Sequence, residues 1–160
     1  MFADSDDDSS EMGPTNGKVS TATSEPTTVG FNGKRIVIDQ QKIEATAERL
    51  RQHLNKLAGE DDSNFRKMIV ESFLQTAPSF VEKIETAFQT GATEVIQYAA
   101  HSLKSSSQLV GASRLSSLSY ELESQSRDGS LDGMEKHPML IRREFEILRE
   151  AITSAMHLIV

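Results

Sequence analysis

Apolar residues recur at spacings of three and four through nearly every segment after residue 40. This spacing is the sequence feature that most limits which folds the chain can adopt. Such spacing lines apolar side chains along one face of an α-helix. The runs are Ile43, Ala47, Leu50, Leu54 and Leu57; Phe65, Met68, Ile69, Ser72, Phe73 and Thr76; Val81, Ile84, Ala87 and Phe88; Leu115, Leu118 and Leu122; and Ile141, Phe145, Leu148, Ile152 and Ala155. No strand alternation of useful length is found. The expected fold class is all-α.

Capping and helix-breaking residues separate these runs. The expected N-caps are Asp39, Asp61-Asp62-Ser63, Thr93 and Ser113, and the expected helix ends are Gly59, Gly91, Gly111 and Asp128-Gly129. Pro78 and Pro138 suit the first turns of two further helices. Because the connections between these helices are short, we expect the helices to pack antiparallel as a bundle.

Residues 1–30 differ in composition from the rest of the chain. They are rich in Asp, Ser, Thr, Gly and Pro, and they hold six acidic residues against one lysine. A segment with so few large apolar residues buries too little surface to offset its ordering entropy. We therefore expect a disordered acidic tail over residues 1–30. Asn32-Gly33 predicts a turn, followed by the short apolar run 36–38.

Composition also excludes several classes of protein. The net charge is −7, and basic residues are nowhere concentrated enough to predict binding to nucleic acid or to an anionic membrane. The absence of cysteine excludes disulfides and thiol chemistry. No apolar run approaches the roughly 18 residues of a membrane span. The N-terminus lacks the basic and apolar regions of a signal peptide. We expect a soluble, cytoplasmic monomer.

Common enzyme signatures are missing from the sequence. There is no phosphate-cradling glycine loop and no strained nucleophile turn for a serine hydrolase. The Glu-x-x-His pattern of di-iron bundles does not occur, and the four histidines are too scattered to predict a metal site. His53 is expected to be a surface or boundary residue.

His101 is the residue with the most distinctive surroundings. At about 100° per residue, an apolar face gathers on one side of the helix that contains it, and His101 points away from that face. The apolar face comprises Val95, Ile96, Ala99, Leu103, Ser106 and Val110. The helical neighbours of His101 are polar: Glu94, Gln97, Lys104, Ser105 and Gln108. The alternative is an ordinary exposed face that happens to include a histidine.

The chemistry of this face favours a phosphoryl carrier. Imidazole ionises near neutral pH, so an exposed ring has an unprotonated nitrogen that can attack phosphorus. Lys104, one turn away, is placed to offset the charge of a phosphoryl group. Gln97 and Gln108 could orient the ring or the phosphoryl oxygens. Since this face lacks a general base, metal ligands and pocket walls, another protein would have to supply the active site.

The segment Ala100-His101-Ser102-Leu103-Lys104-Ser105-Ser106-Ser107-Gln108-Leu109-Val110-Gly111-Ala112 resembles the signature of histidine-containing phosphotransfer (HPt) domains. That signature is Ala-His-x-Leu-Lys-Gly-Ser-Ser-x-x-hydrophobic-Gly-Ala, followed by a leucine-rich helix that commonly ends in Leu-Glu. Leu115, Leu118 and Leu122-Glu123 are similar to this continuation, and the resemblance covers residues 38–157. It implies an antiparallel up-down four-helix bundle with an additional N-terminal helix.

The resemblance also implies a function. His101 would be phosphorylated and Lys104 would steady the phosphoryl group, while Gly111 would make the tight turn to the next helix. The partners would be receiver domains of a hybrid histidine kinase and of a response regulator, docking on a face that includes Glu94, Tyr98 and Ser105. The chain would be a phosphocarrier without a cofactor of its own, and Mg²⁺ would be bound by the receiver. We expect a free-standing protein, and a fragment of a larger kinase is the alternative. In a eukaryote, a protein this small could also enter the nucleus, although no sequence feature encodes this.

Ser105 departs from the HPt signature, which has glycine at this position. The position lies one turn from His101, so we expect the serine to narrow or slow docking of the receiver without blocking it. Two alternatives therefore stay open. One is a module that docks receivers without transferring phosphoryl groups, and the other is a helical adaptor regulated through its acidic tail.

Overall fold

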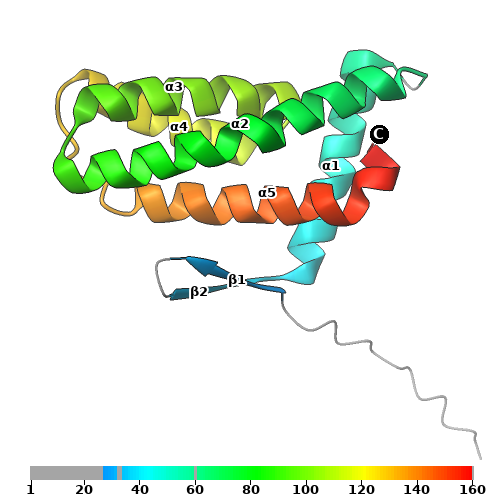
Figure 1. Cartoon of the computed structure of the whole chain (residues 1–160), viewed down its shortest axis with the longest axis horizontal. Coiled ribbons are helices and arrows are strands. Elements are labelled where there is room, and N and C mark those ends of the chain that lie inside the picture. Colours follow the sequence, from blue (N-terminus) through cyan, green and yellow to red (C-terminus); the bar gives the residue numbers. More distant parts are fainter. Residues whose placement is uncertain (1–26, 32–33, 60, 160) are drawn as a thin grey trace, which may run out of the picture.

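A computed structural model describes residues 27–31, 34–59 and 61–159 of the 160-residue chain. The elements, in order, are β1 (Thr27–Phe31), β2 (Lys34–Ile38), α1 (Gln40–Ala58), α2 (Ser63–Thr90), α3 (Thr93–Val110), α4 (Ser113–Arg127) and α5 (His137–Ile159). The helices α2 to α5 lie alongside one another, and α1 crosses one end of them (Figure 1). α1 packs mainly on α5, whereas α3 packs mainly on α4 and α2. The predicted four-helix bundle with an additional N-terminal helix is confirmed.

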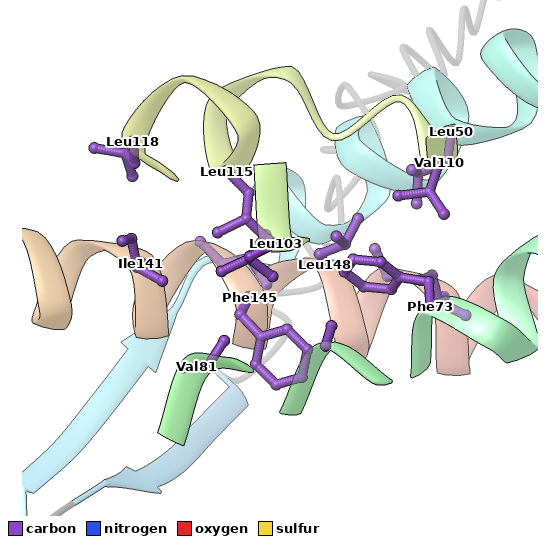
Figure 2. Packing of buried hydrophobic residues seen from close by; sticks show 14 of the residues in the cluster. Leu50, Phe73, Val81, Leu103, Val110, Leu115, Leu118, Ile141, Phe145 and Leu148 are labelled. Atoms are coloured by element: carbon purple, nitrogen blue, oxygen red, sulfur yellow. The ribbon is translucent and has the colours of Figure 1, made fainter. Parts of the chain in front are cut away.

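The core is continuous between the four bundle helices and α1. Figure 2 shows labelled side chains from α1 to α5 gathered there, among them the rings of Phe73 and Phe145. Their centroids lie 6.2 Å apart at an interplanar angle of 46°. Leu103, from the helix that contains His101, is fully buried in this cluster. Packing of this kind holds α3 in one rotational setting and so fixes which of its residues face outward.

The prediction of two helices divided at Pro78 is wrong, because α2 runs unbroken from Ser63 to Thr90. Proline inside a helix removes a backbone hydrogen bond and costs about 3 kcal/mol. Burial on both sides of the proline offsets this cost, since Ala77 and Val81 are fully buried.

The predicted inward stripe of α2 is also rotated in its first half. Phe65 and Met68 are 38 % and 56 % exposed, and Arg66 and Val70 are buried instead. The Arg66 guanidinium donates to the carbonyls of Gly59 and Ile159, at 2.5 and 3.2 Å, and so ties the ends of α1 and α5 together. Smaller corrections of the same kind apply to Leu57 in α1 and Val95 in α3, which are 46 % and 45 % exposed.

A two-stranded antiparallel hairpin precedes α1, although the sequence predicted no strand. The register pairs Thr27 with Ile38 and Phe31 with Lys34. Ile38 is buried while Val37 is 57 % exposed, which is the alternation of a strand with one covered face. Five-residue strands are too short to stand out against helical periods. The predicted turn at Asn32-Gly33 and residues 1–26 of the predicted tail lie outside the described residues, and residues 27–30 belong to β1.

The observed helix boundaries agree with the predicted glycine ends better than with the predicted N-caps. Asp39 and Asp62 cap α1 and α2 as predicted, accepting from the backbone N–H groups of Gln41 and Phe65. The predicted caps Thr93 and Ser113 are wrong, because the N-cap positions are taken by alanines that make no side-chain cap bond. Each of these alanines directly follows a left-handed glycine, so the helix restarts one residue earlier than expected.

Gly111 makes the predicted tight turn between α3 and α4, with a φ of 81°. The N–H of Ala112 donates to the Ser107 carbonyl at 2.8 Å, which closes α3 in the manner of a Schellman motif. A Cβ atom on Gly111 would lie 2.5 Å from Cγ of His53 in α1. Glycine is therefore required here both for the backbone conformation and for the close approach of α1.

Candidate functional site

His101 lies in the middle of α3 with 62 % of its side chain exposed. Its neighbours Ala99, Ala100 and Leu103 are fully buried, so the helix can present the ring only on its outer side. The sequence predicted this outward position.

A buried carboxylate from the next helix holds the ring. Oε1 of Glu123, in α4, lies 2.9 Å from Nδ1 of His101. Lys104 donates to Oε2 at 2.7 Å, and Arg127 donates to Oε1 at 2.9 Å. Although its side chain is only 4 % exposed, Glu123 is thus paired with two cations and an imidazole. One carboxylate joins the histidine and the lysine that the sequence singled out.

These contacts keep Glu123 ionised. Burial alone would raise the pKa of its carboxyl group, but hydrogen bonds from Lys104 and His101 outweigh burial and lower that pKa. An ionised carboxylate only accepts hydrogen bonds, so Nδ1 of His101 must carry a proton. In a neutral ring, the lone pair then resides on Nε2. The arrangement therefore leaves Nε2 as the ring nitrogen with a lone pair available for reaction.

An open hollow surrounds the ring. It is lined by Glu94, Gln97, Tyr98, His101, Glu123 and Arg127. Tyr98 is 63 % exposed and packs edge-on against Phe80 of α2, with ring centroids 6.3 Å apart. The hollow is open to solvent, so a group on a second protein can reach the imidazole without rearrangement of the backbone.

The structure brings most of the predicted site residues together, but not all of them. Gln97, Glu94 and Tyr98 line the hollow with His101. Gln108 is exposed but is not among the lining residues, and it lies seven residues or about 10 Å along α3 from His101. Ser105 is exposed, and its hydroxyl donates to the carbonyl of His101 at 3.0 Å.

Lys104 occupies a position that sequence reasoning did not foresee. Its side chain is 19 % exposed, and its ammonium group bonds Glu123 while lying 5.6 Å from the centre of the Tyr120 ring. The lysine is therefore held by the same carboxylate that contacts the imidazole.

Sequence reasoning missed Glu123 and Arg127 as members of the site. A signal was present, because Glu123 follows Leu115 by eight residues and Ser119 by four, which puts a charged residue on the inward face of α4. Arg127 follows one turn later and pairs with Glu123 along the helix.

Two further structural findings bear on the chemistry. Within the described residues, no three or more His, Cys, Asp or Glu side chains are grouped in a way that could hold a metal ion. Every helix of that same part of the chain is too short or too polar to traverse a lipid bilayer.

Comparison with known proteins finds one matching family model and one similar solved structure. A family model described as the Hpt domain matches residues 68–153, which is more than half of the chain. No curated protein sequence matches the chain significantly. Among solved structures, the chain is similar to histidine-containing phosphotransfer protein B (HptB) from Pseudomonas aeruginosa PAO1, with a TM-score of 0.60 and 24 % identity over 66 % of this chain and 91 % of that one. At this identity the likeness shows a shared fold.

Proposed function

Because the chain belongs to the Hpt family, whose members are phosphocarriers in phosphorelays, we propose that His101 accepts a phosphoryl group from a receiver aspartate and passes it to another receiver. The observation that carries the proposal is the exposed imidazole whose Nδ1 lies 2.9 Å from the buried carboxylate of Glu123. Receiver domains are the partners of this family. The specific partners we propose are a hybrid histidine kinase and a response regulator.

In the proposed reaction, the lone pair on Nε2 attacks the phosphorus of an aspartyl phosphate. An N–P bond forms while the P–O bond to the aspartate breaks, and the carboxylate leaves with the electron pair. The ring keeps its Nδ1 proton and becomes positively charged, next to the carboxylate of Glu123. The reverse sequence of bonds delivers the phosphoryl group to the next receiver. Mg²⁺ would be bound by the receiver and not by this chain.

Lys104 and Gln97 are proposed to stabilise the phosphoryl group. The Lys104 ammonium group lies one turn from His101 and is already partly exposed, so it can turn from Glu123 toward a new anion. Arg127 would then remain on Glu123 and limit the loss of charge pairing. Gln97 lines the hollow and can donate a hydrogen bond to a phosphoryl oxygen. Gln108 is the weaker candidate for this role, because it lies two turns away.

The test is phosphoryl transfer from a phosphorylated receiver in the presence of Mg²⁺. Wild-type chain should acquire an acid-labile label, and His101→Gln should not. His157→Gln is the matched control, because His157 is also an exposed helical histidine and lies near the end of α5. Loss of label in both variants, or retention in both, would contradict the proposal.

A non-transferring docking module is the second candidate function. The Ser105 side chain next to His101 favours it, because this is the position at which the family signature has glycine. In this case wild-type chain would bind receivers but acquire no label. Binding without label would therefore replace the first proposal with the second.

A further inference from the structure

A second hollow lies on another part of the molecule, where α1, α5 and the turn from α3 into α4 meet. Its floor is apolar and includes Leu50, Leu115 and Leu148, three core residues labelled in Figure 2. Its lining also includes three basic side chains, Lys42, Arg49 and Arg114, and one acidic side chain, Glu144. We call this hollow the basic groove.

The basic groove carries an excess of positive charge. Oε1 of Glu144 accepts from Lys42 at 2.9 Å and from Arg114 at 3.1 Å. Glu144 is 12 % exposed, so one partly buried carboxylate is shared by two cations. The Arg49 side chain is exposed and donates a hydrogen bond to the Thr46 hydroxyl. Because that hydroxyl is neutral, this bond does not neutralise the charge of Arg49. Three cations against one carboxylate favour an anionic ligand.

The chain itself contains a segment with complementary chemistry. Residues 1–11 carry Asp4, Asp6, Asp7, Asp8 and Glu11 without any basic side chain. Phe2 adds an aromatic side chain at the start of the acidic run, which suits an apolar floor. No other stretch of the sequence has as many acidic residues so close together.

The path of the chain brings this segment within reach of the groove. Thr27, where the described chain begins, pairs with Ile38, the residue before the N-cap of α1. Lys42 of the basic groove stands in the first turns of α1, only four residues beyond Ile38. Residues 12–26 form the connection, and fifteen residues span at most about 50 Å. Because the connection is covalent, docking would be intramolecular and would not require a high affinity.

We propose that the acidic segment 1–11 docks in the basic groove of its own chain, with its carboxylates on Lys42, Arg49 and Arg114 and Phe2 against the apolar floor. The groove would then be an intramolecular binding surface for the N-terminus. This inference is independent of phosphoryl transfer by His101, because its evidence and its test concern another face of the molecule.

A nitroxide label tests the proposal in the full-length chain. Since the sequence has no cysteine, Ala3→Cys creates a unique labelling site. Paramagnetic broadening of backbone amide signals should then be strongest at Lys42, Thr46 and Arg114, and much weaker around His101. It should diminish at an ionic strength of about 1 M, where the Debye length falls to about 3 Å.

Charge variants and a mixing experiment complete the test. Arg49→Glu should strongly reduce the broadening without breaking the ion pairs of Glu144, whereas Arg143→Glu, an exposed arginine of α5 outside the groove, should leave it unchanged. Asp6, Asp7 and Asp8 changed together to Asn should also reduce it. Uniform broadening, broadening centred elsewhere, or insensitivity to these substitutions would overturn the proposal. In a mixture, one chain can carry the nitroxide while the other is observed by NMR. Broadening at the groove that arises only between two such chains would show that the groove binds the acidic segment of a second copy, and it would overturn intramolecular docking.

Discussion

The Nδ1 atom of His101 lies 2.9 Å from Oε1 of Glu123, although the two residues are 22 positions apart and belong to different helices. This contact joins an exposed ring to a carboxylate that is almost fully buried. A buried carboxylate with fixed partners has little freedom to move, so it orients the ring as well as setting its proton. A residue of α4 therefore determines which ring nitrogen of His101, in α3, carries the proton.

The tautomer of His101 should depend on Glu123. In wild-type chain at alkaline pH, the neutral ring should be protonated on Nδ1, because Glu123 accepts that proton's hydrogen bond. In Glu123→Ala the acceptor is lost, and the ring should become a mixture of both tautomers. Nitrogen-15 chemical shifts of the ring measure the two populations. An unchanged tautomer ratio in Glu123→Ala would show that the carboxylate does not set the proton.

Glu123 should also make the folded chain sensitive to acid. Its pKa is lower in the folded chain than the ordinary value, because hydrogen bonds from Lys104 and His101 outweigh the effect of burial. Its stabilisation is therefore complete at pH values above the unfolded carboxyl pKa, about 4.3, and is lost as pH falls through the lower folded value. Glu123→Gln should cost about 1–3 kcal/mol of unfolding free energy at pH 7, and this difference should shrink on acidification.

Urea denaturation between pH 7 and pH 3 measures this effect. Glu82→Gln is a suitable control, because Glu82 is an exposed carboxylate on α2 and its loss should change stability by less than about 0.5 kcal/mol. A difference between wild type and Glu123→Gln that stays constant with pH would contradict the predicted linkage.

The sequence predicts the outward position of His101 but not its contacts with the charged residues of α4, and the reason is physical. The outward position of His101 follows from the local period of α3, which is determined by residues close in sequence. The contact with Glu123 depends on how α3 and α4 pack, and no local period reports that packing. A glutamate on the inward face of a leucine-rich helix was nevertheless a visible anomaly, because a charged residue is rarely buried unless it is paired.

The errors in α2 have a related cause. The period through Phe65 and Met68 is genuine, but an adjacent stripe through Val70 and Ala77 has nearly the same spacing. The choice between the stripes is made by tertiary contacts, among them the bonds from Arg66 to the ends of α1 and α5. Arginine is mostly exposed in folded proteins, whereas here the Arg66 guanidinium bonds carbonyls from two other elements.

Two left-handed glycines should differ in their tolerance of alanine. Gly91 and Gly111 have φ values of 70° and 81°, so alanine at either position should cost about 1–2 kcal/mol for the backbone conformation. A Cβ on Gly91 meets no atom within 4 Å, whereas a Cβ on Gly111 would collide with His53. Gly111→Ala should therefore be clearly more destabilising than Gly91→Ala in thermal or urea denaturation.

A double-mutant cycle isolates the contribution of the collision. His53→Ala removes two of the three atoms that a Cβ on Gly111 would meet, so it should recover part of the stability lost in Gly111→Ala. The same His53 substitution combined with Gly91→Ala should be additive. Equal costs for the two glycines and additivity in both pairs would refute the close approach of α1 to this turn.

Substitutions at Ser105 should separate steric hindrance from loss of helix stability. The Ser105 hydroxyl donates to the carbonyl of His101 at 3.0 Å, so the serine side chain is folded back along the helix and hinders a partner less than a longer side chain would. Ser105→Gly should preserve or speed phosphoryl transfer, even though glycine inside a helix costs about 1 kcal/mol of stability relative to alanine. Ser105→Gln should abolish transfer, because its longer side chain reaches over the face that carries the imidazole. Rates of transfer from a phosphorylated receiver, at receiver concentrations that do not saturate, give the comparison.

Ser117→Gln is the matched control, because Ser117 is an exposed serine of α4 whose hydroxyl makes the same kind of bond to the Ser113 carbonyl at 3.0 Å. Equal rates for serine, glycine and glutamine at position 105 would show that this position does not limit the approach of a receiver.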